Sequence, residues 1–171
     1  MTPQNRAIAE HILACYDTIY IVLGESAATF TNDAYVVRVY ELARAHGELA
    51  LELREYLDSP TNEPVPVLEA VLRRAVAGDD TGALALYAMA MVVGPRLLIS
   101  LLDARTALES EPRLTELFNN ASTVCVKEMR ATGEVAKDQA PIDDVEWQST
   151  ARDLATTLDV AGNAESLGLS R

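Results

Sequence analysis

Apolar side chains recur three and four residues apart along most of the chain, which is the pattern of amphipathic helices, and strand-like alternation is not apparent. The first repeat predicts a helix over residues 2–23, with Thr2 and Pro3 at its start and Gly24 as its stop. One face of this predicted helix gathers the side chains that should enter the core, which are Ile8, Ile12, Cys15, Ile19 and Val22.

A second repeat predicts a helix over residues 33–57, capped by Asn32 or Asp33. Its apolar positions alternate three and four apart, which is typical of a helix seam in a bundle or a coiled coil. The predicted seam consists of Val36, Val39, Ala43, His46, Ala50, Leu53 and Leu57. The charged residues fall on other faces and are expected to be solvated; they are Arg38, Glu41, Arg44, Glu48, Glu52 and Glu55.

Prolines at positions 60, 64 and 66 mark the clearest break in the chain, because proline blocks helix continuation. The length of this break, 58–66, favours a crossover connection over a tight turn. A short helix over 67–77 should follow, and then a long apolar helix over 82–108. Pro95 lacks the N–H group that would bond back four residues, so we expect a kink near residues 91–95.

A fourth long helix is predicted from about residue 112 to 137, with an inner face of Leu114, Phe118, Ala121, Cys125 and Met129. The pattern changes at residue 138. Residues 138–141 read as a hinge, 142–160 as a short amphipathic helix, and 162–171 as a flexible tail. The sequence therefore predicts an all-α chain with a four-helix bundle over 1–137 and a helical appendage over 138–171.

The apolar stretch Ala83–Leu102 is long enough to span a bilayer, and Arg96 is its only charge. The Gly94-Pro95 pair, that central arginine and the lack of a basic flank speak against a span. We expect instead a helix buried on most sides, whose surplus apolar surface over 82–108 joins two copies of the chain in a homo-oligomer.

The net charge of −12 argues against binding to nucleic acid or to anionic lipid, both of which need clustered cations. The 171 residues contain only two cysteines, Cys15 and Cys125, 110 positions apart. They make no disulfide framework, so a cytoplasmic location is expected. Both are predicted to fill the core, and a redox pair is the alternative.

The layout of four long helices with a proline-rich crossover resembles the ferritin-like superfamily over about residues 5–137. The local element that carries the resemblance is the run from Glu41 to Leu53, ELARAHGELALEL. The resemblance implies a ferritin-like four-helix bundle. In that superfamily, two metal ions are held by a glutamate from each of two helices and a Glu-x-x-His motif from each of the others.

This chain lacks that ligand set. Its two histidines, His11 and His46, are preceded three residues earlier by Ile8 and Ala43 rather than by glutamate. The leading expectation is therefore no cofactor. The alternative is a reduced site for a single Zn, Fe or Mn ion, with His46, Glu48, Glu10 and Glu128 as candidate ligands.

Sequence motifs for hydrolases, nucleotide binding and metalloproteases are missing, so no catalytic residue is assigned. The expected function is a non-catalytic helical scaffold or protein-interaction module that self-associates. Two alternatives remain: the reduced metal site in a stress-protective protein, and a small-molecule binder that uses a tyrosine-lined interior. The candidates for such a lining are Tyr16 and Tyr20, which stand one turn apart, together with Tyr35, Tyr40, Tyr56 and Tyr87.

Overall fold

The computed structural model describes residues 1–60, 63–137 and 145–164, and side chains over 1–60, 63–135 and 148–159. Within these ranges the chain forms helices joined by turns and has no strand, so the all-α prediction is confirmed. The helices are α1 (Pro3–Ala27), α2 (Asp33–Leu57), α3 (Pro66–Ala77), α4 (Ala83–Ala88), the π-helical turn η1 (Met89–Val93), α5 (Gly94–Ala107), α6 (Pro112–Lys137) and α7 (Val145–Ala164).

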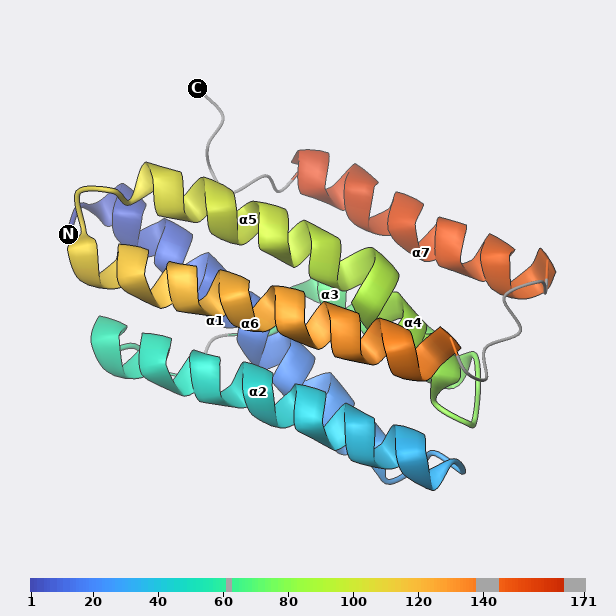
Figure 1. Ribbon diagram of the computed structural model, residues 1–171. Helices are drawn as coiled ribbons and strands as arrows, with labels where there is room; N and C mark the ends of the chain where they lie inside the picture. Colours follow the sequence, from blue (N-terminus) through green and yellow to red (C-terminus); the bar gives the residue numbers. More distant parts are fainter. Residues whose placement is uncertain (61–62, 138–144, 165–171) are drawn as a thin grey trace.

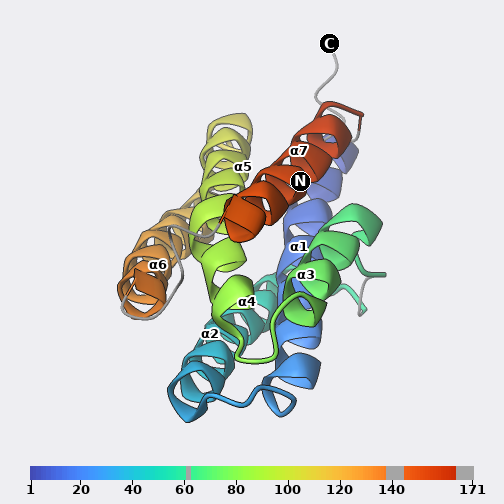
Figure 2. The ribbon, with the colours of Figure 1, turned by 90° about the vertical axis from the view of Figure 1, so that its right-hand side faces the viewer.

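The helices lie alongside one another as two close pairs (Figure 1). Helix α1 packs along α2, and α5 packs along α6. Contacts of α2 with α6 and of α1 with α5 join the pairs into one core. Helices α3 and α7 cover the outside of this core, where α3 rests on α1 and α7 rests on α3, α4 and η1 (Figure 2).

The beginnings of α1 and α2 agree with the predicted capping residues. The Thr2 hydroxyl accepts a hydrogen bond from the Asn5 amide at 3.1 Å, and the Asn32 side chain accepts from the Ala34 and Tyr35 amides. The predicted stop at Gly24 is wrong, because α1 continues to Ala27. Burial of Ser26 and Ala27 against the fold offsets the modest cost of a glycine inside a helix.

The crossover between α2 and α3 is anchored at both of its ends. Asp58 takes up the left-handed conformation (φ 47°) that ends α2. The Arg6 guanidinium donates to the Leu57 carbonyl oxygen at 2.8 Å, and the Thr18 hydroxyl accepts from the Val65 amide at 2.9 Å. Two polar side chains of α1 therefore hold the proline-rich connection against the core.

The disturbance predicted near residues 91–95 takes the form of a π-helical turn. Pro95 has no amide hydrogen to donate, and the Gly94 amide reaches back five residues to the Met89 carbonyl oxygen. The apolar helix is thus continuous from Ala83 to Ala107, with a local change of register. π-Helical turns of this kind are frequent at functional sites in proteins.

Two helices are long and apolar enough to cross a membrane, Pro3–Ala27 and Ala83–Ala107. In the fold, 56% and 61% of their most apolar windows are buried against other helices. Many side chains of the apolar helix Ala83–Ala107 are buried, including Leu84, Leu86, Leu97 and Leu101. Length and composition are shared by membrane spans and by core helices of folded bundles, so these two features do not assign the chain to either class.

The C-terminal helix is longer than predicted. Helix α7 extends to Ala164, so residues 162–164 are helical where a tail was expected. The hinge at 138–141 and the remainder of the tail, 165–171, lie outside the described residues. Leu154 is fully buried, and the Arg96 guanidinium makes two 2.7 Å hydrogen bonds to the Asp159 carboxylate. These contacts dock α7 on the surface of the apolar helix.

Candidate functional site

A cluster of polar side chains lies in the middle of the core, beside the π turn. We call it the buried polar cluster, and it consists of Tyr16, Arg38, His46, Cys125, Glu128 and Thr132. Helices α1, α2 and α6 each contribute to it. Polar groups inside a protein are costly unless they are paired, so their partners decide what the cluster can do.

Arg38 is the charged centre of this cluster. The expectation that it is solvated is wrong, since only 8% of the residue is exposed. Its guanidinium forms an ion pair with the Glu128 carboxylate and donates to the Thr132 hydroxyl at 3.0 and 3.2 Å. Another N–H group of the Arg38 guanidinium donates to the Glu41 carboxylate at 3.0 Å. The buried positive charge is thereby matched by a carboxylate of α6 whose side chain is 14% exposed and by a buried hydroxyl one turn along.

His46 lies in the α2 seam, as predicted, and is 4% exposed. Its Nδ1 is 2.8 Å from the Leu42 carbonyl oxygen, which can only accept, so Nδ1 is the protonated nitrogen. The ring also lies against Tyr16, with 5.5 Å between the ring centroids. Burial lowers the pKa of His46 below its usual value, and this outweighs the Leu42 carbonyl and the Glu128 carboxylate, which favour the charged ring.

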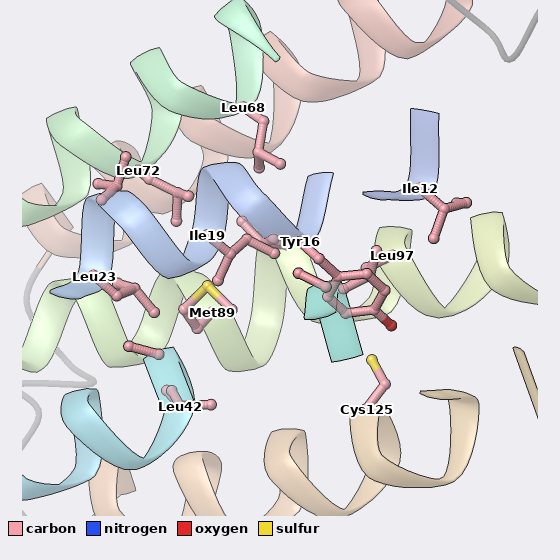
Figure 3. Packing of buried hydrophobic residues seen from close by; sticks show 14 of the residues in the cluster. Ile12, Tyr16, Ile19, Leu23, Leu42, Leu68, Leu72, Met89, Leu97 and Cys125 are labelled. Atoms are coloured by element: carbon pink, nitrogen blue, oxygen red, sulfur yellow. The ribbon is translucent and has the colours of Figure 1, made fainter. Parts of the chain in front are cut away.

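The Tyr16 hydroxyl faces the same region from α1. Figure 3 shows it directed toward the sulfur of Cys125, which projects from α6. The hydroxyl is buried and has no hydrogen-bond partner among the described residues. Burial, together with the two nearby cysteines, raises the pKa of Tyr16 well above its usual value. Burial also raises the pKa of the Cys125 thiol to about 11, so both groups are neutral at physiological pH.

The cluster encloses little free space. A cavity of about 10 Å³ is lined by Leu42, His46, Met89, Gly94, Cys125, Glu128, Met129 and Thr132. This volume suits at most about one water molecule. Neither cysteine forms a disulfide: Cys125 is buried in the core, and Cys15 is half-buried with its sulfur 3.7 Å from His11 Nε2.

The four candidate metal ligands are divided by the fold. His46 and Glu128 line the same cavity, and Glu128 is already paired with Arg38. Glu48 lies on the outer face of α2 beside Arg44, and Glu10 pairs with Arg6 at 2.8 Å. Over the described residues, no group of three or more His, Cys, Asp or Glu side chains lies close enough together to hold a metal ion.

A second polar pair joins α1 to α2 away from this cluster. The Arg54 guanidinium donates to the Asp17 carboxylate at 2.5 Å, and Asp17 is almost fully buried. The other Asp17 oxygen and Arg54 Nε have no hydrogen-bond partner among the described side chains and backbone. The pair fixes the register of α1 against α2, because it crosslinks positions near the middle of one helix and the end of the other.

A second hollow, larger than the cavity of the buried polar cluster, lies on the described surface between α1 and α2. We call it the α1–α2 groove; it has a volume of about 580 Å³ and is lined by Tyr20, Ile21, Gly24, Glu25, Tyr40, Ala43 and Arg44. Gly24 and Ala43 are small residues on its two helices. Tyr20 and Tyr40 are 48% and 47% exposed, so each presents an aromatic face to solvent.

Sequence reasoning missed two elements of these sites. Arg38 and Glu128 lie 90 positions apart, and no spacing rule links them. The groove was missed because Tyr20 and Tyr40 belong to different helices, whose pairing becomes visible only after folding. Of the tyrosines named as a possible lining of the interior, Tyr16 and Tyr35 are buried, whereas Tyr20, Tyr40 and Tyr56 are exposed.

The chain matches no protein-family model, and it shows no significant similarity to a curated protein or to a solved structure.

Proposed function

We propose that this protein is a non-catalytic helical interaction module and that the α1–α2 groove is its docking surface. The observation that carries the proposal is the groove itself, an open hollow of about 580 Å³ edged by two half-exposed tyrosines. Tyrosine is enriched at the energetic centres of protein interfaces, because it combines large apolar area with a polar tip.

The character of the buried polar cluster supports the same proposal. Its charges neutralise each other in the Arg38–Glu128 pair, and its cavity of about 10 Å³ is too small for a substrate. The Cys125 thiol, with a pKa of about 11, is a poor nucleophile at neutral pH. The cluster therefore suits a structural role that fixes how α2 and α6 pack.

The proposal includes the finer description of the fold. We interpret α1, α2, the continuous helix Ala83–Ala107 and α6 as a ferritin-like four-helix bundle, with α3 in the crossover and α7 as an appendage. The crossover between the second and third long helices supports this layout. We also propose a cytoplasmic protein, on the grounds of its acidic charge and of two cysteines that form no disulfide.

Self-association through the apolar helix remains part of the proposal. Much of the surplus surface of this helix is covered by α7, which rests on α4 and η1. Three of its large apolar side chains are still exposed, namely Met91, Ile99 and Leu102. Light scattering of wild-type protein beside an Ile99→Ser variant tests this interface: we expect a dimer that the substitution weakens, and a wild-type monomer at all concentrations contradicts it.

Photo-crosslinking inside cells tests the docking role of the groove. A photoreactive phenylalanine analogue replaces Tyr40 in one variant and Arg113, an exposed residue of α6, in the control. We expect one discrete adduct from position 40 that is absent from position 113 and that disappears when Tyr20 is also changed to Ser. The same adducts from both positions, or none from position 40, would contradict the proposal.

A second candidate function is the reduced metal site, favoured by one observation: His46 and Glu128 face one cavity. Metal analysis of the purified protein checks it, with His46→Ala as the decisive variant and Glu48→Ala as the exposed control. Stoichiometric Zn, Fe or Mn that is lost only in the His46 variant would favour this second function over the first.

A further inference from the structure

The outer face of α2 carries a second seam, separate from the one that enters the core and apolar at three of its five positions, Val37, Tyr40 and Leu51. Its positions alternate three and four residues apart, which is the spacing of a coiled-coil contact surface. We call it the outer seam; it consists of Val37, Tyr40, Arg44, Gly47 and Leu51. Val37 and Leu51 are 58% and 51% exposed, so both aliphatic side chains face solvent rather than the core.

At Gly47, the seam position that has no side chain, a residue of α1 covers α2. The Tyr20 ring lies directly over Gly47, since a Cβ atom built there would be 2.8 Å from Tyr20 Cδ2. Tyr20 also lines the α1–α2 groove together with Tyr40 and Arg44. The outer seam and the groove therefore form one continuous strip, which spans the 15 residues from Val37 to Leu51, or about 21 Å of helix.

A row of glutamates borders the outer seam. Glu41, Glu48 and Glu55 are spaced by seven. Each directly follows a position of one heptad repeat, which consists of the seam residues Tyr40 and Gly47 and then Arg54, just beyond the seam. This places the glutamates where a coiled coil carries its pairing charges. All three are exposed. Glu41 is paired with buried Arg38, and Glu48 with Arg44 at 3.5 Å, a solvated contact of small energy. Arg44 is the one exposed cation on α2, against Glu41, Glu48, Glu52 and Glu55.

From this strip we infer the class of partner: a basic amphipathic helix of another protein, with apolar residues at heptad spacing and lysine or arginine beside them. Its apolar side chains pack between Val37, Tyr40 and Leu51, and its cations pair with the glutamate row. The inference rests on the proposed interaction function and adds the chemistry of the partner. The overall charge of −12 acts in the same direction, because it attracts a cationic partner from a distance.

A second copy of this chain fits the strip poorly. Two outer seams related by an antiparallel two-fold axis bring the glutamate row of one copy beside that of the other, and facing like charges oppose association. A basic helix meets the same row with opposite charge. Charge complementarity therefore selects the hetero-partner over self-pairing at this face, which is distinct from the apolar helix 82–108.

Binding of defined peptides to the full-length protein tests the inference. The probe is a labelled 21-residue peptide with leucine at the heptad contact positions, lysine beside them and alanine elsewhere. One comparison peptide carries glutamate in place of each lysine, and another has the basic composition in scrambled order. Fluorescence anisotropy should show that the basic heptad peptide binds at least about tenfold more tightly than either, with an affinity that falls as salt rises.

Paired charge reversals locate the binding surface. Glu48→Lys with Glu55→Lys should weaken binding of the basic heptad peptide about tenfold or more. The matched control is Glu116→Lys with Glu134→Lys, exposed positions of α6, which changes the net charge by the same amount and should leave binding within about twofold. Leu51→Ser, an exposed position, should weaken binding without lowering the melting temperature.

The alternative results of these binding measurements contradict different parts of the inference. Equal loss of binding in both charge-reversed pairs, or equal binding of the scrambled peptide, shows a general attraction to cations and overturns the inference. Tighter binding of the acidic peptide that still depends on Leu51 overturns the basic partner and leaves the groove function intact. A dimer in light scattering that Leu51→Ser dissociates identifies a second copy as the occupant, which also overturns it. Photo-crosslinking at position 40 tests the proposed docking function independently of these peptide measurements.

Discussion

Arg38 is the side chain that most distinguishes this interior from an ordinary apolar core. Its guanidinium is buried and is held by Glu128 and Thr132 of α6, so one residue of α2 fixes the position of the opposite helix. A buried ion pair contributes less to net stability than its Coulomb attraction suggests, because both ions lose their hydration. It is nevertheless expensive to break, because the remaining charge stays buried.

The Arg38→Met variant should lose about 3 kcal/mol or more of unfolding free energy, since it leaves the Glu128 carboxylate without its partner. The double variant Arg38→Met with Glu128→Leu should be more stable than the single one, because it removes both charges. Urea unfolding of the four proteins of this cycle provides the measurement. A loss below about 1 kcal/mol in the single variant would show that Glu128 is solvated.

His46 should make stability depend on pH near neutrality. Its pKa is lowered in the folded state by burial, so the fold keeps the ring neutral while the unfolded chain protonates it near its usual value. Stability is therefore full above about pH 6.5 and falls as the pH decreases below that value toward the folded pKa. Around the ring, Tyr16, Arg38, Cys125 and Glu128 are the ionisable neighbours contributed by α1, α2 and α6.

Thermal unfolding between about pH 5.5 and 7.5 checks this expectation. The wild-type melting temperature should fall toward the acidic end, and a His46→Gln variant should show a flatter profile over the same interval. Parallel profiles for the two proteins would mean that other groups produce the pH dependence.

Among the helices, the π turn η1 packs closely against α6 at its C-terminal end. Gly94 sits at its end, where a Cβ atom would be 2.6 Å from Met129 Cγ and 2.7 Å from the Met89 carbonyl oxygen. The methionine side chain can move, but the carbonyl belongs to the backbone of the π turn. The close approach of η1 to α6 therefore requires glycine at this position.

Two glycine-to-alanine substitutions separate packing from helix propensity. Gly94→Ala should destabilise the protein by about 1–3 kcal/mol through overpacking. Gly24→Ala, inside α1 where nothing lies within 4 Å of the added methyl group, should stabilise it by about 0.5–1 kcal/mol. Chemical denaturation of both variants tests the contrast, and a neutral Gly94→Ala variant would show that η1 relaxes at little cost.

At the scale of the whole molecule, α7 determines how much of the apolar surface of α4 and η1 is exposed to solvent. It covers η1 and α4, with Leu154 fully buried and Arg96 bound to Asp159. The ion pair of Arg96 with Asp159 of α7 also explains how a cation is accommodated on so apolar a helix. Helix α7 therefore covers part of the core, whereas the outer seam of α2 remains exposed.

Replacing Leu154 with Asp should detach α7, because the interface cannot accommodate an unpaired charge. We expect faster amide exchange in α7 and increased association at high concentration, as the apolar surface of α4 and η1 becomes exposed. The exposed neighbour Thr156→Asp serves as the control with the same added charge. Unchanged exchange in α7 would contradict a docked appendage.

The sequence by itself determined the helices and most of the residues they bury. Thr2 and Asn32 predicted the starts of α1 and α2, the prolines near position 60 predicted the crossover, and Pro95 predicted the disturbance in the apolar helix. These features depend on neighbours within a few residues, so local rules suffice to find them. The periodicity of α2 likewise identified the side chains of its core face, including His46.

The tertiary structure alone decided the burial of Arg38, the separation of Glu10 and Glu48 from His46, and the docking of α7. Each depends on which helix faces which, and helical periodicity specifies only which residues share a face. The same reason applies to Val37, Tyr40 and Leu51. Their spacing is visible in the sequence, yet only the packed helices show that no described element covers them.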